Sequence, residues 1–267
     1  MYEVSVVIRT RDIEDKLFKL LSMLAAQTIK PKQIVIVDNY SCERSLRNMK
    51  SFLLKAKKKL FTSETAIRLV ALPDELFSHA YSTNLGVYFA DNEFVCITNG
   101  HSLPISRRWL ENGLIHFENP KIAGVSGYFL PLSNASLWEK LQHFIWVLER
   151  KGMNILKREF YFSTINCILR KSLWKKYPFD ENLPKIIPES KRYGGEDYDW
   201  GLEMIARNYK ITVDPKFNVY HCHGESFAPF FWKHLMYSKI KRSLKRLKRP
   251  RKSFTAVFES RTCYYDL

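Results

Sequence analysis

Hydrophobic and polar positions follow two alternating patterns along the first hundred residues. Continuous runs rich in β-branched residues predict strands that are covered on both faces, at residues 4–10, 33–37, 66–72 and 93–98. Between these runs, apolar residues recur at helical spacing and predict helices at 13–27, 46–60 and 78–90. Strands that alternate with helices predict an α/β fold with a mixed, mostly parallel central sheet flanked by helices, and a ligand crevice at the carboxyl ends of the strands.

The pattern is less regular after residue 105. It predicts helices at 106–117, 136–151 and 196–208, and strands at 122–128, 163–169, 210–213 and 219–223. Residues 178–193 are rich in Pro and Lys and are expected to form a loop. No break in composition marks a linker, and no repeat is visible. The parts of the chain before and after residue 105 are therefore expected to share one continuous sheet.

Composition restricts the class of protein. With 267 residues, of which 46% are hydrophobic, the chain can bury a full core. The five cysteines are scattered without CxxC spacing, so we expect reduced thiols and neither a disulfide framework nor a structural zinc site. No uninterrupted apolar run of about 18 residues is present, and the chain begins in a strand-like segment, so a cytoplasmic location is expected.

The formal charge of +16 is concentrated near the C-terminus, where ten Lys or Arg and no acid lie between residues 226 and 258. In residues 229–252, one helical face carries the apolar side chains of Trp232, Leu235, Met236, Ile240, Leu244 and Leu247. A basic amphipathic helix of this kind is typical of a segment that binds an anionic membrane surface. The alternatives are a helix docked on the core and a nucleic-acid arm, and the lack of a recognition module disfavours nucleic acid.

Polar side chains end the first two predicted strands. Thr10, Arg11 and Asp12 lie at the end of the first strand, and Asp38 lies at the end of the second. At the rim of the crevice such groups can bind a nucleotide base or ribose. Capping of the local turns explains the same residues equally well.

The segment GGEDYDW at 194–200 is the strongest local motif. Gly194 and Gly195 let the backbone approach a ligand, and Glu196 and Asp197 begin a helix, where the helix dipole favours negative charge. An ionised carboxylate beside a crevice can act as the general base that deprotonates a hydroxyl nucleophile. The competing interpretation is that these acids only stabilise the start of the helix.

The segment VYHCHGES at 219–226 places His221 and His223 two residues apart in an extended run, so both side chains leave the same face. Imidazoles on one face can share a cation or a phosphate. A single buried structural histidine is the alternative.

Taken in order, VSVVIRT, QTIKPKQIVIVDNYS, the stretch from FSHAYSTNLG to RRWLENGL, GVSG, GGEDYDWGLEMIARNYKI and VYHCH resemble the family 2 inverting glycosyltransferases of the GT-A fold. The rhamnosyltransferase-like members of polysaccharide or O-antigen assembly are the most similar, over about residues 4–225. The resemblance implies a GT-A domain at 1–226, with a nucleotide-sugar half at 1–104 and an acceptor half at 105–226. Residues 227–267 would form a basic C-terminal extension.

The resemblance also implies an activity. A hexose or deoxyhexose would pass from a UDP-, dTDP- or GDP-sugar to a hydroxyl of a lipid-linked or polysaccharide acceptor, with inversion, at the inner face of a membrane. Asp197, beside Glu196, would be the base, and His221 and His223 would reach a metal or the diphosphate. The nucleotide would be bound by five residues: Arg9, Thr10, Asp12, Asp38 and Asn99.

The chain departs from the family where an acidic pair normally holds Mn²⁺ or Mg²⁺. That position reads Asn99-Gly100-His101, and the Arg usual before NLG is Thr83. Three outcomes stay open: His101 joins the later histidines on a borderline metal, positive side chains replace the metal, or donor binding is lost. A catalytically silent nucleotide-sugar or glycan binder is therefore the second hypothesis. A sugar nucleotidyltransferase would need a Gly-rich loop with a basic residue after the first strand, which RTRDIED lacks.

Overall fold

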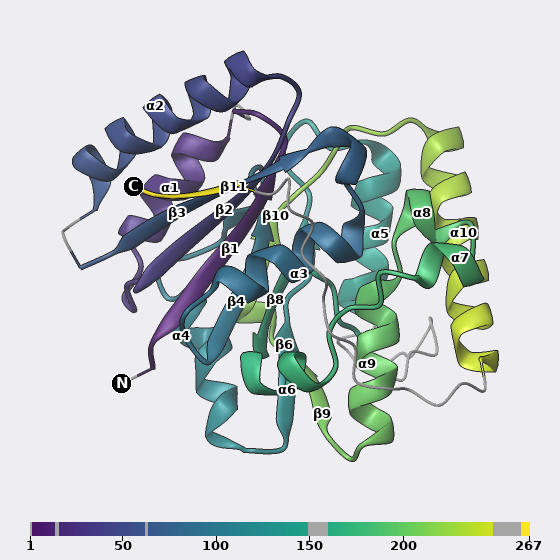
Figure 1. Ribbon diagram of the computed structural model, residues 1–267. Coiled ribbons are helices and arrows are strands. Elements are labelled where there is room, and N and C mark those ends of the chain that lie inside the picture. Colours follow the sequence, from purple (N-terminus) through teal and green to yellow (C-terminus); the bar gives the residue numbers. More distant parts are fainter. Residues whose placement is uncertain (1, 14–15, 62–63, 149–159, 248–262) are drawn as a thin grey trace.

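The computed structural model describes residues 2–13, 16–61, 64–148, 160–247 and 263–267. An eight-stranded sheet runs through the molecule in the order β11-β3-β2-β1-β4-β8-β6-β9 (Figure 1). Two strands, β8 and β11, are antiparallel to their neighbours, and the other adjacent pairs are parallel. The strands are β1 (Val4–Thr10), β2 (Gln33–Tyr40), β3 (Ala66–Pro73), β4 (Phe94–Asn99), β6 (Ile122–Ser126), β8 (Asn166–Arg170), β9 (Lys210–Val213) and β11 (Cys263–Asp266).

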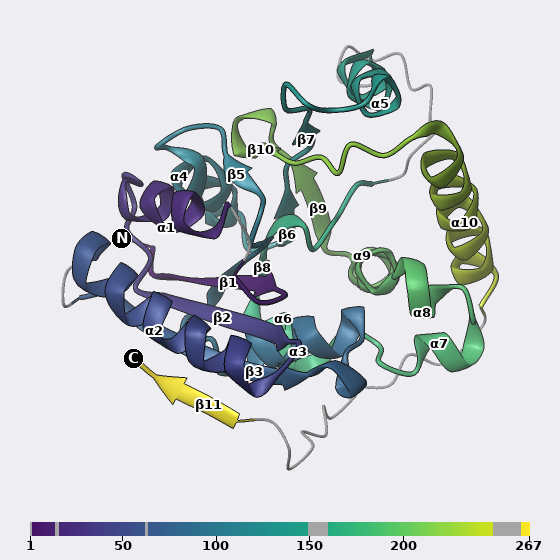
Figure 2. The ribbon, with the colours of Figure 1, turned by 90° about the horizontal axis from the view of Figure 1, so that it is seen from above.

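Helices cover both faces of this sheet (Figure 2). Side chains alternate along a strand, so Ile8 of β1 packs into the core on one face and Val7 into the core on the other. The helices on the Ile8 face are α1 (Leu17–Ala25), α2 (Glu43–Leu60) and α4 (Trp109–Leu114). Those on the Val7 face are α3 (His79–Phe89), α6 (Lys171–Lys176) and α9 (Glu196–Ala206). The predicted α/β architecture, with one sheet shared by both halves, is confirmed.

Several predicted boundaries need correction. Residues 178–193, expected to form a loop, contain α7 (Leu183–Ile186) and α8 (Ser190–Tyr193). The strand expected at 163–169 is β8, which begins only at Asn166. β2 continues beyond its predicted end to Tyr40, because Asn39 and Tyr40 pair with Leu72 and Pro73 of β3. Parts of the helices expected at 13–27 and 136–151, namely 14–15 and 149–151, lie outside the described residues.

A second, three-stranded sheet lies next to the cleft described below, and two of its strands, β5 and β7, are not predicted from the sequence. It consists of β5 (Leu103–Pro104), β10 (Val219–Tyr220) and β7 (Phe129–Leu130). Its strands are too short to produce a hydrophobic period. The strand expected at 219–223 is therefore only β10, and His221 and His223 follow it in irregular backbone.

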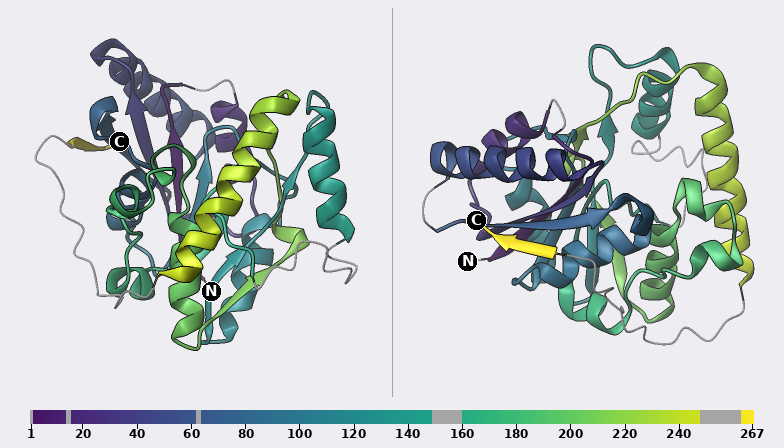
Figure 3. Two further views of the ribbon diagram at one scale, coloured as in Figure 1. Left: turned by 90° about the vertical axis from the view of Figure 1, so that its right-hand side faces the viewer. Right: turned by 45° about the horizontal axis from the view of Figure 1, so that its top comes forward.

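The described C-terminal residues are integrated into the molecule. Helix α10 (Phe227–Arg246) lies beside α5 (Leu137–Leu148), and the rings of Phe227 and Trp138 are 4.6 Å apart (Figure 3). Farther along α10, Ile240 and Leu244 are buried against residues of α7 and α9. β11 then pairs with the edge strand β3. The basic residues at 248–252 lie outside the described part of the chain, within which no helix combines the length and apolarity needed to cross a bilayer.

Candidate active site

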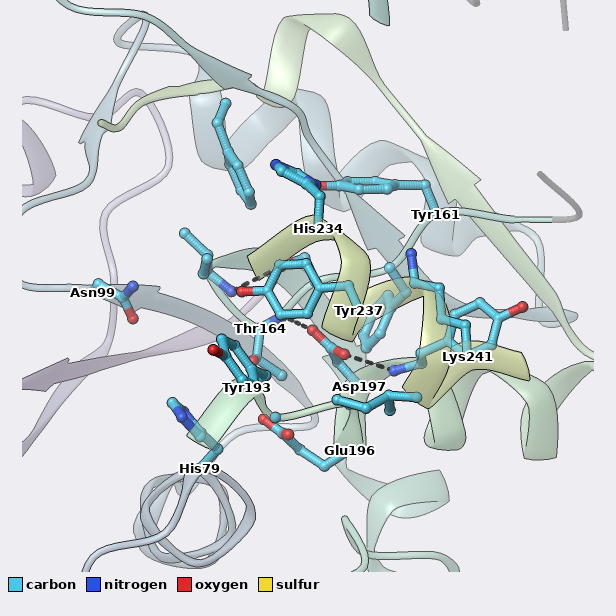
Figure 4. A pocket seen from close by; sticks show the side chains of 18 of the residues that line it. His79, Asn99, Tyr161, Thr164, Tyr193, Glu196, Asp197, His234, Tyr237 and Lys241 are labelled. Atoms are coloured by element: carbon cyan, nitrogen blue, oxygen red, sulfur yellow. Dashed lines mark hydrogen bonds between the residues drawn. The ribbon is translucent and has the colours of Figure 1, made fainter. Parts of the chain in front are cut away.

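A cleft of about 1090 Å³ opens at the carboxyl ends of β1 and β4, and residues of α5, α10 and the start of α9 form its far wall (Figure 4). It brings together seven of the ten residues predicted for the site, namely Arg9, Thr10, Asn99, His101, Glu196, Asp197 and His223. The other three, Asp12, Asp38 and His221, are not among the residues that line it.

Asp38 and Asp12 support the loop after β1. Asp38 is fully buried, because it lies inside β2 and not at the end of the strand. Its Oδ1 accepts a hydrogen bond of 2.8 Å from the backbone N of Asp12, whose own carboxylate accepts one from Ser41 N at 2.9 Å. Thr10 Oγ1 donates to the carbonyl of Asp12 at 3.0 Å. Asn39, which sequence reasoning missed, reaches the cleft lining from the same strand.

The guanidinium of Arg9 joins three separate segments at the floor of the cleft. Nη1 donates to Thr83 Oγ1 at 2.8 Å, and Nη2 donates to Asn99 Oδ1 at 3.3 Å and to the carbonyl of Thr164 at 3.1 Å. Burial lowers the pKa of Arg9, and the nearby carboxylates of Glu196 and Asp197 oppose that shift. The guanidinium of Arg9 is therefore a positive charge with a fixed position beneath the cleft.

Asp197 lies in the first turn of α9. Its Oδ1 accepts a 2.7 Å hydrogen bond from the backbone N of Tyr198, and its Oδ2 accepts a 3.3 Å bond from Thr164 N (Figure 4). Burial, followed by the negative charge of Glu196, raises the pKa of Asp197 to about 6. Burial also raises the pKa of Glu196, which is 4% exposed, while Arg9 partly offsets it. Asp197 is thus a fixed carboxylate able to exchange a proton near neutral pH.

The two glycines before α9 serve helix packing as well as the cleft. Gly194 and Gly195 have φ values of 74° and 117°, which L side chains rarely adopt. A Cβ on Gly195 would lie 2.7 Å from Cγ2 of Ile240, so a side chain there would push α10 away. The sequence predicts only that these glycines let the backbone approach a ligand. In the structure, Gly195 also leaves the room that α10 needs to pack against the start of α9.

That contact brings two residues that sequence reasoning missed to the cleft. Tyr237 and Lys241 of α10 lie on the same side of the cleft as Asp197 (Figure 4). The charge of Lys241 favours the ionised form of Asp197. Burial raises the pKa of Tyr237 above its ordinary value. The only sequence signal for both residues is that they share a helical face with Ile240 and Leu244.

His101, His221 and His223 form a cluster at the edge of the cleft. One ring nitrogen from each lies within 4.8 Å of the others. The Nε2 atoms of His221 and His223 are 3.1 Å apart, and the rings of His101 and His221 stack at 4.7 Å. Burial, and then the neighbouring imidazoles, hold the pKa of His221 well below its ordinary value. The predicted histidines are therefore brought together, with the ring of His221 kept neutral by its surroundings.

The wall of the cleft opposite the sheet is aromatic and basic. Its aromatic side chains include Trp138 from α5, Tyr161 and, from α10, Phe230. Lys241, Arg242 and Lys245 of α10 also line it. This wall can contact both an apolar group and an anion.

Comparison with known proteins gives the fold a context. Neither a scan against protein-family models nor a search of curated proteins finds a match. Among solved structures, the chain is similar to mannosyltransferase PcManGT from Pyrobaculum calidifontis in complex with GDP-Man and Mn²⁺. The TM-score is 0.63 at 16% identity, over 94% of this chain and 67% of that one.

It is also similar to S. aureus TarS 1–349 in complex with UDP-GlcNAc, with a TM-score of 0.56 at 14% identity, over 93% of this chain and 68% of that one. In a further TarS structure the match covers 41% of the TarS chain. The chain therefore shares its fold with structures that hold a nucleotide-sugar.

Proposed function

We propose that this protein is an inverting glycosyltransferase. In the proposed reaction a sugar moves from a UDP-, dTDP- or GDP-sugar to a hydroxyl of a lipid-linked or polysaccharide acceptor. The observation that carries the proposal is the position of Asp197, a carboxylate with a pKa of about 6, in a cleft at the carboxyl ends of the sheet. The fold shared with structures that contain GDP-Man or UDP-GlcNAc supports it.

The donor is proposed to bind against residues 1–104. Thr10 and Asn39 offer polar atoms at the ends of β1 and β2, and Asn99 does so at the end of β4. The guanidinium of Arg9 supplies positive charge beneath them. Such a charge favours the negatively charged diphosphate that departs in the reaction.

Asp197 is proposed as the general base. Its carboxylate accepts the proton of the acceptor hydroxyl while the hydroxyl oxygen bonds to the anomeric carbon of the donor. The bond between that carbon and the diphosphate breaks on the opposite side, so the nucleoside diphosphate leaves with the electron pair and the configuration inverts. Backbone hydrogen bonds from Thr164 and Tyr198 keep the carboxylate in position for this step.

The acceptor is proposed to approach along α5 and α10, where Lys241, Arg242 and Lys245 can contact a phosphate and the aromatic side chains an attached lipid. Outside the cleft, both helices expose large apolar side chains, among them Leu137 (71% exposed), Phe144 (57%) and Trp232 (56%). Apolar side chains next to basic ones are typical of a surface that binds an anionic membrane. We therefore propose that the enzyme acts at the cytoplasmic face of a membrane.

The test is release of nucleoside diphosphate from a panel of UDP-, dTDP- and GDP-sugars, with the wild type and Asp197→Asn. We expect the substitution to lower kcat by about 10²- to 10⁴-fold while the Kd for the donor stays within about threefold. Asp199→Asn is the matched control, because it makes the same charge change on the same helix at a residue that is not part of the cleft lining. Equal activity of Asp197→Asn and the wild type would exclude Asp197 as the base.

A second candidate is a nucleotide-sugar or glycan binder without catalysis. It is favoured by the absence of an acidic side chain at residues 99–101. Binding of a nucleotide-sugar with no turnover, in the presence of acceptor glycolipid extracts and of each divalent cation, would establish it.

A further inference from the structure

The turn after β4 does not fit the oxygen-liganded ion expected at that position. Mg²⁺ and Mn²⁺ prefer carboxylate, carbonyl and water oxygens. Gly100 has no side chain, and the amide oxygen of Asn99 already accepts a hydrogen bond from Arg9 at 3.3 Å. The donor groups that do converge here are imidazole nitrogens.

We propose that His101, His221 and His223 form a three-imidazole site for a borderline divalent ion of the Zn²⁺ or Co²⁺ type. Two of the ligands come from the segment after β10 and the third from the turn after β4, so the site closes only in the folded chain. Tetrahedral zinc with nitrogen ligands places those nitrogens about 3.3 Å from one another. The observed separation of 3.1 Å between the Nε2 atoms of His221 and His223, and the 4.8 Å limit for the whole set, require only small ring movements.

Partners behind the rings support this assignment. Ser102 is fully buried, and its Oγ lies 3.0 Å from Nδ1 of His221. This hydrogen bond leaves Nε2 of His221 for the ion and fixes the orientation of the ring, as outer hydrogen bonds do in known metal sites. The carboxylate of Glu139 on α5 accepts hydrogen bonds from the backbone N atoms of His223, at 2.7 Å, and Gly224, at 3.2 Å. The position of His223 is therefore set by α5.

The ligand chemistry favours one class of ion. Imidazole suits Zn²⁺, Co²⁺, Ni²⁺ and Cu²⁺, whereas a site without carboxylates discriminates against Mg²⁺ and Ca²⁺. His101 and His223 both line the cleft, which leaves the side of the site toward the cleft for an exogenous oxygen ligand.

The role of the ion rests on the proposed function. There it would bind the diphosphate of the donor, close to Arg9 and Asn99. The binding site itself stands on the geometry of the three histidines, and metal binding is therefore tested without turnover.

The experiment uses the full chain, freed of any polyhistidine tag and stripped of metal with a chelator. Co²⁺ is titrated while its visible ligand-field absorption is followed, and Zn²⁺ and Mg²⁺ are titrated separately by calorimetry. We expect one equivalent of Co²⁺ to give the spectrum of a tetrahedral or five-coordinate ion, and Zn²⁺ to bind at least about 100-fold more tightly than Mg²⁺.

Variants locate the ion. His101→Ala and His223→Ala should each lower Zn²⁺ affinity by about 100-fold or more, and the positioning variant Ser102→Ala by about 10- to 100-fold. His234→Ala is the control, because His234 lines the same cleft from α10 without belonging to the cluster. Circular dichroism and Tm verify that each variant is folded.

The proposal is overturned if Co²⁺ gives no ligand-field bands at one equivalent. It is also overturned if His234→Ala loses as much affinity as His223→Ala. Zn²⁺ binding without glycosyl transfer would support the site and contradict the proposed function. Transfer that is unchanged in a folded His101→Ala variant lacking Zn²⁺ would support the function and remove the ion from it.

Discussion

At the scale of single residues, the chemistry of the cleft depends on the groups that surround each charged side chain. Both terminal nitrogens of Arg9 donate hydrogen bonds, so its charge stays in place beneath the donor side. Asp197 has backbone donors on both oxygens but a second carboxylate, Glu196, beside it. Its ionisation is therefore opposed by burial and by like charge, and its proton affinity is moved toward neutral pH.

The first prediction concerns the pH dependence of the proposed transfer. Only ionised Asp197 can accept the proton of the hydroxyl, so kcat/KM should rise about tenfold per pH unit below about 6 and level off above it. The measurement is a pH–rate profile of kcat/KM with donor binding determined at each pH. A flat profile between about pH 5 and 8, with unchanged donor binding, would contradict the role of Asp197.

The second prediction concerns stability. Below a pH of about 4, Asp197 is protonated in both the folded and the unfolded chain, so its ionisation does not change the free energy of unfolding. Between about 4 and 6 the unfolded chain releases this proton first, so the free energy of unfolding decreases, and above 6 the full cost of about 1–3 kcal/mol applies. Asp197→Asn removes that cost and should raise Tm by a few degrees at about pH 8 and not at pH 4. A lower Tm at pH 8 would show that the carboxylate stabilises the fold.

At the scale of elements, the junction between α9 and α10 sets the geometry of the far wall. Ile240 and Leu244 pack against the start of α9, and Gly195 makes room for them. The same contact places Tyr237 and Lys241 at the cleft. The position of α10 therefore depends on the fact that Gly195, at the start of α9, has no side chain.

The third prediction uses two glycines that both have positive φ, 117° at Gly195 and 68° at Gly224, but different surroundings. Gly195→Ala places a Cβ 2.7 Å from Ile240, whereas Gly224→Ala, at a φ of 68°, meets nothing closer than 3.7 Å. In both variants, an L side chain at positive φ lowers the free energy of unfolding by about 1–2 kcal/mol. Gly195→Ala also forces α10 to shift, so the free energy of unfolding should fall by about 1–3 kcal/mol more. Equal losses in denaturant titrations would mean that the contact is easily relaxed.

The fourth prediction tests the apolar surface of α10. Phe231 and Trp232 are among its exposed aromatic side chains, and replacing both by Ser should lower partitioning onto anionic vesicles by about tenfold or more in a sedimentation assay. Tyr264→Ser is the control, since that side chain is similarly exposed but lies on β11. Unchanged partitioning of the Phe231 and Trp232 variant would contradict the membrane proposal.

At the scale of the whole molecule, the described C-terminal residues close the fold at the edge opposite β9. β11 covers the edge of β3, and Arg68 forms an ion pair of 2.5 Å with Asp266. The ammonium of Lys50 lies 3.2 Å from the ring centre of Tyr265. Removal of residues 229–267 would uncover this edge and the core beneath α10, and would not separate membrane binding from unfolding. Point substitutions therefore test membrane binding better than a truncated chain.

The fifth prediction is that deletion of residues 263–267 destabilises the entire protein. An uncovered β3 presents unpaired backbone groups, and the loss of the pairing and of the Arg68 ion pair should lower Tm by about 4–8 °C and promote aggregation. Scanning calorimetry and light scattering measure both effects. A truncated chain with the Tm of the full chain would show that β11 contributes nothing to stability.

Part of this fold was predictable from local sequence. The run at 4–10 is a strand with the predicted bounds, because a continuous β-branched sequence specifies a strand buried on both faces. The strand at 210–213 also has the predicted bounds, although it lies at the edge of the sheet and is only partly buried. The boundaries failed where neighbours decide them. β2 extends because β3 offers partners, and the short helices within 178–193 have too few turns to show a period.

The sequence by itself determined the alternation of strands and helices, the acidic start of α9 and the basic face of α10, because each depends on residues close together in the chain. Only the tertiary structure decided what those elements face. It buried Asp38, brought α10 to Asp197, and joined His101 to His221 and His223 across more than a hundred residues. A hydrophobic period records which side of an element is covered, but long-range packing decides which residues cover it.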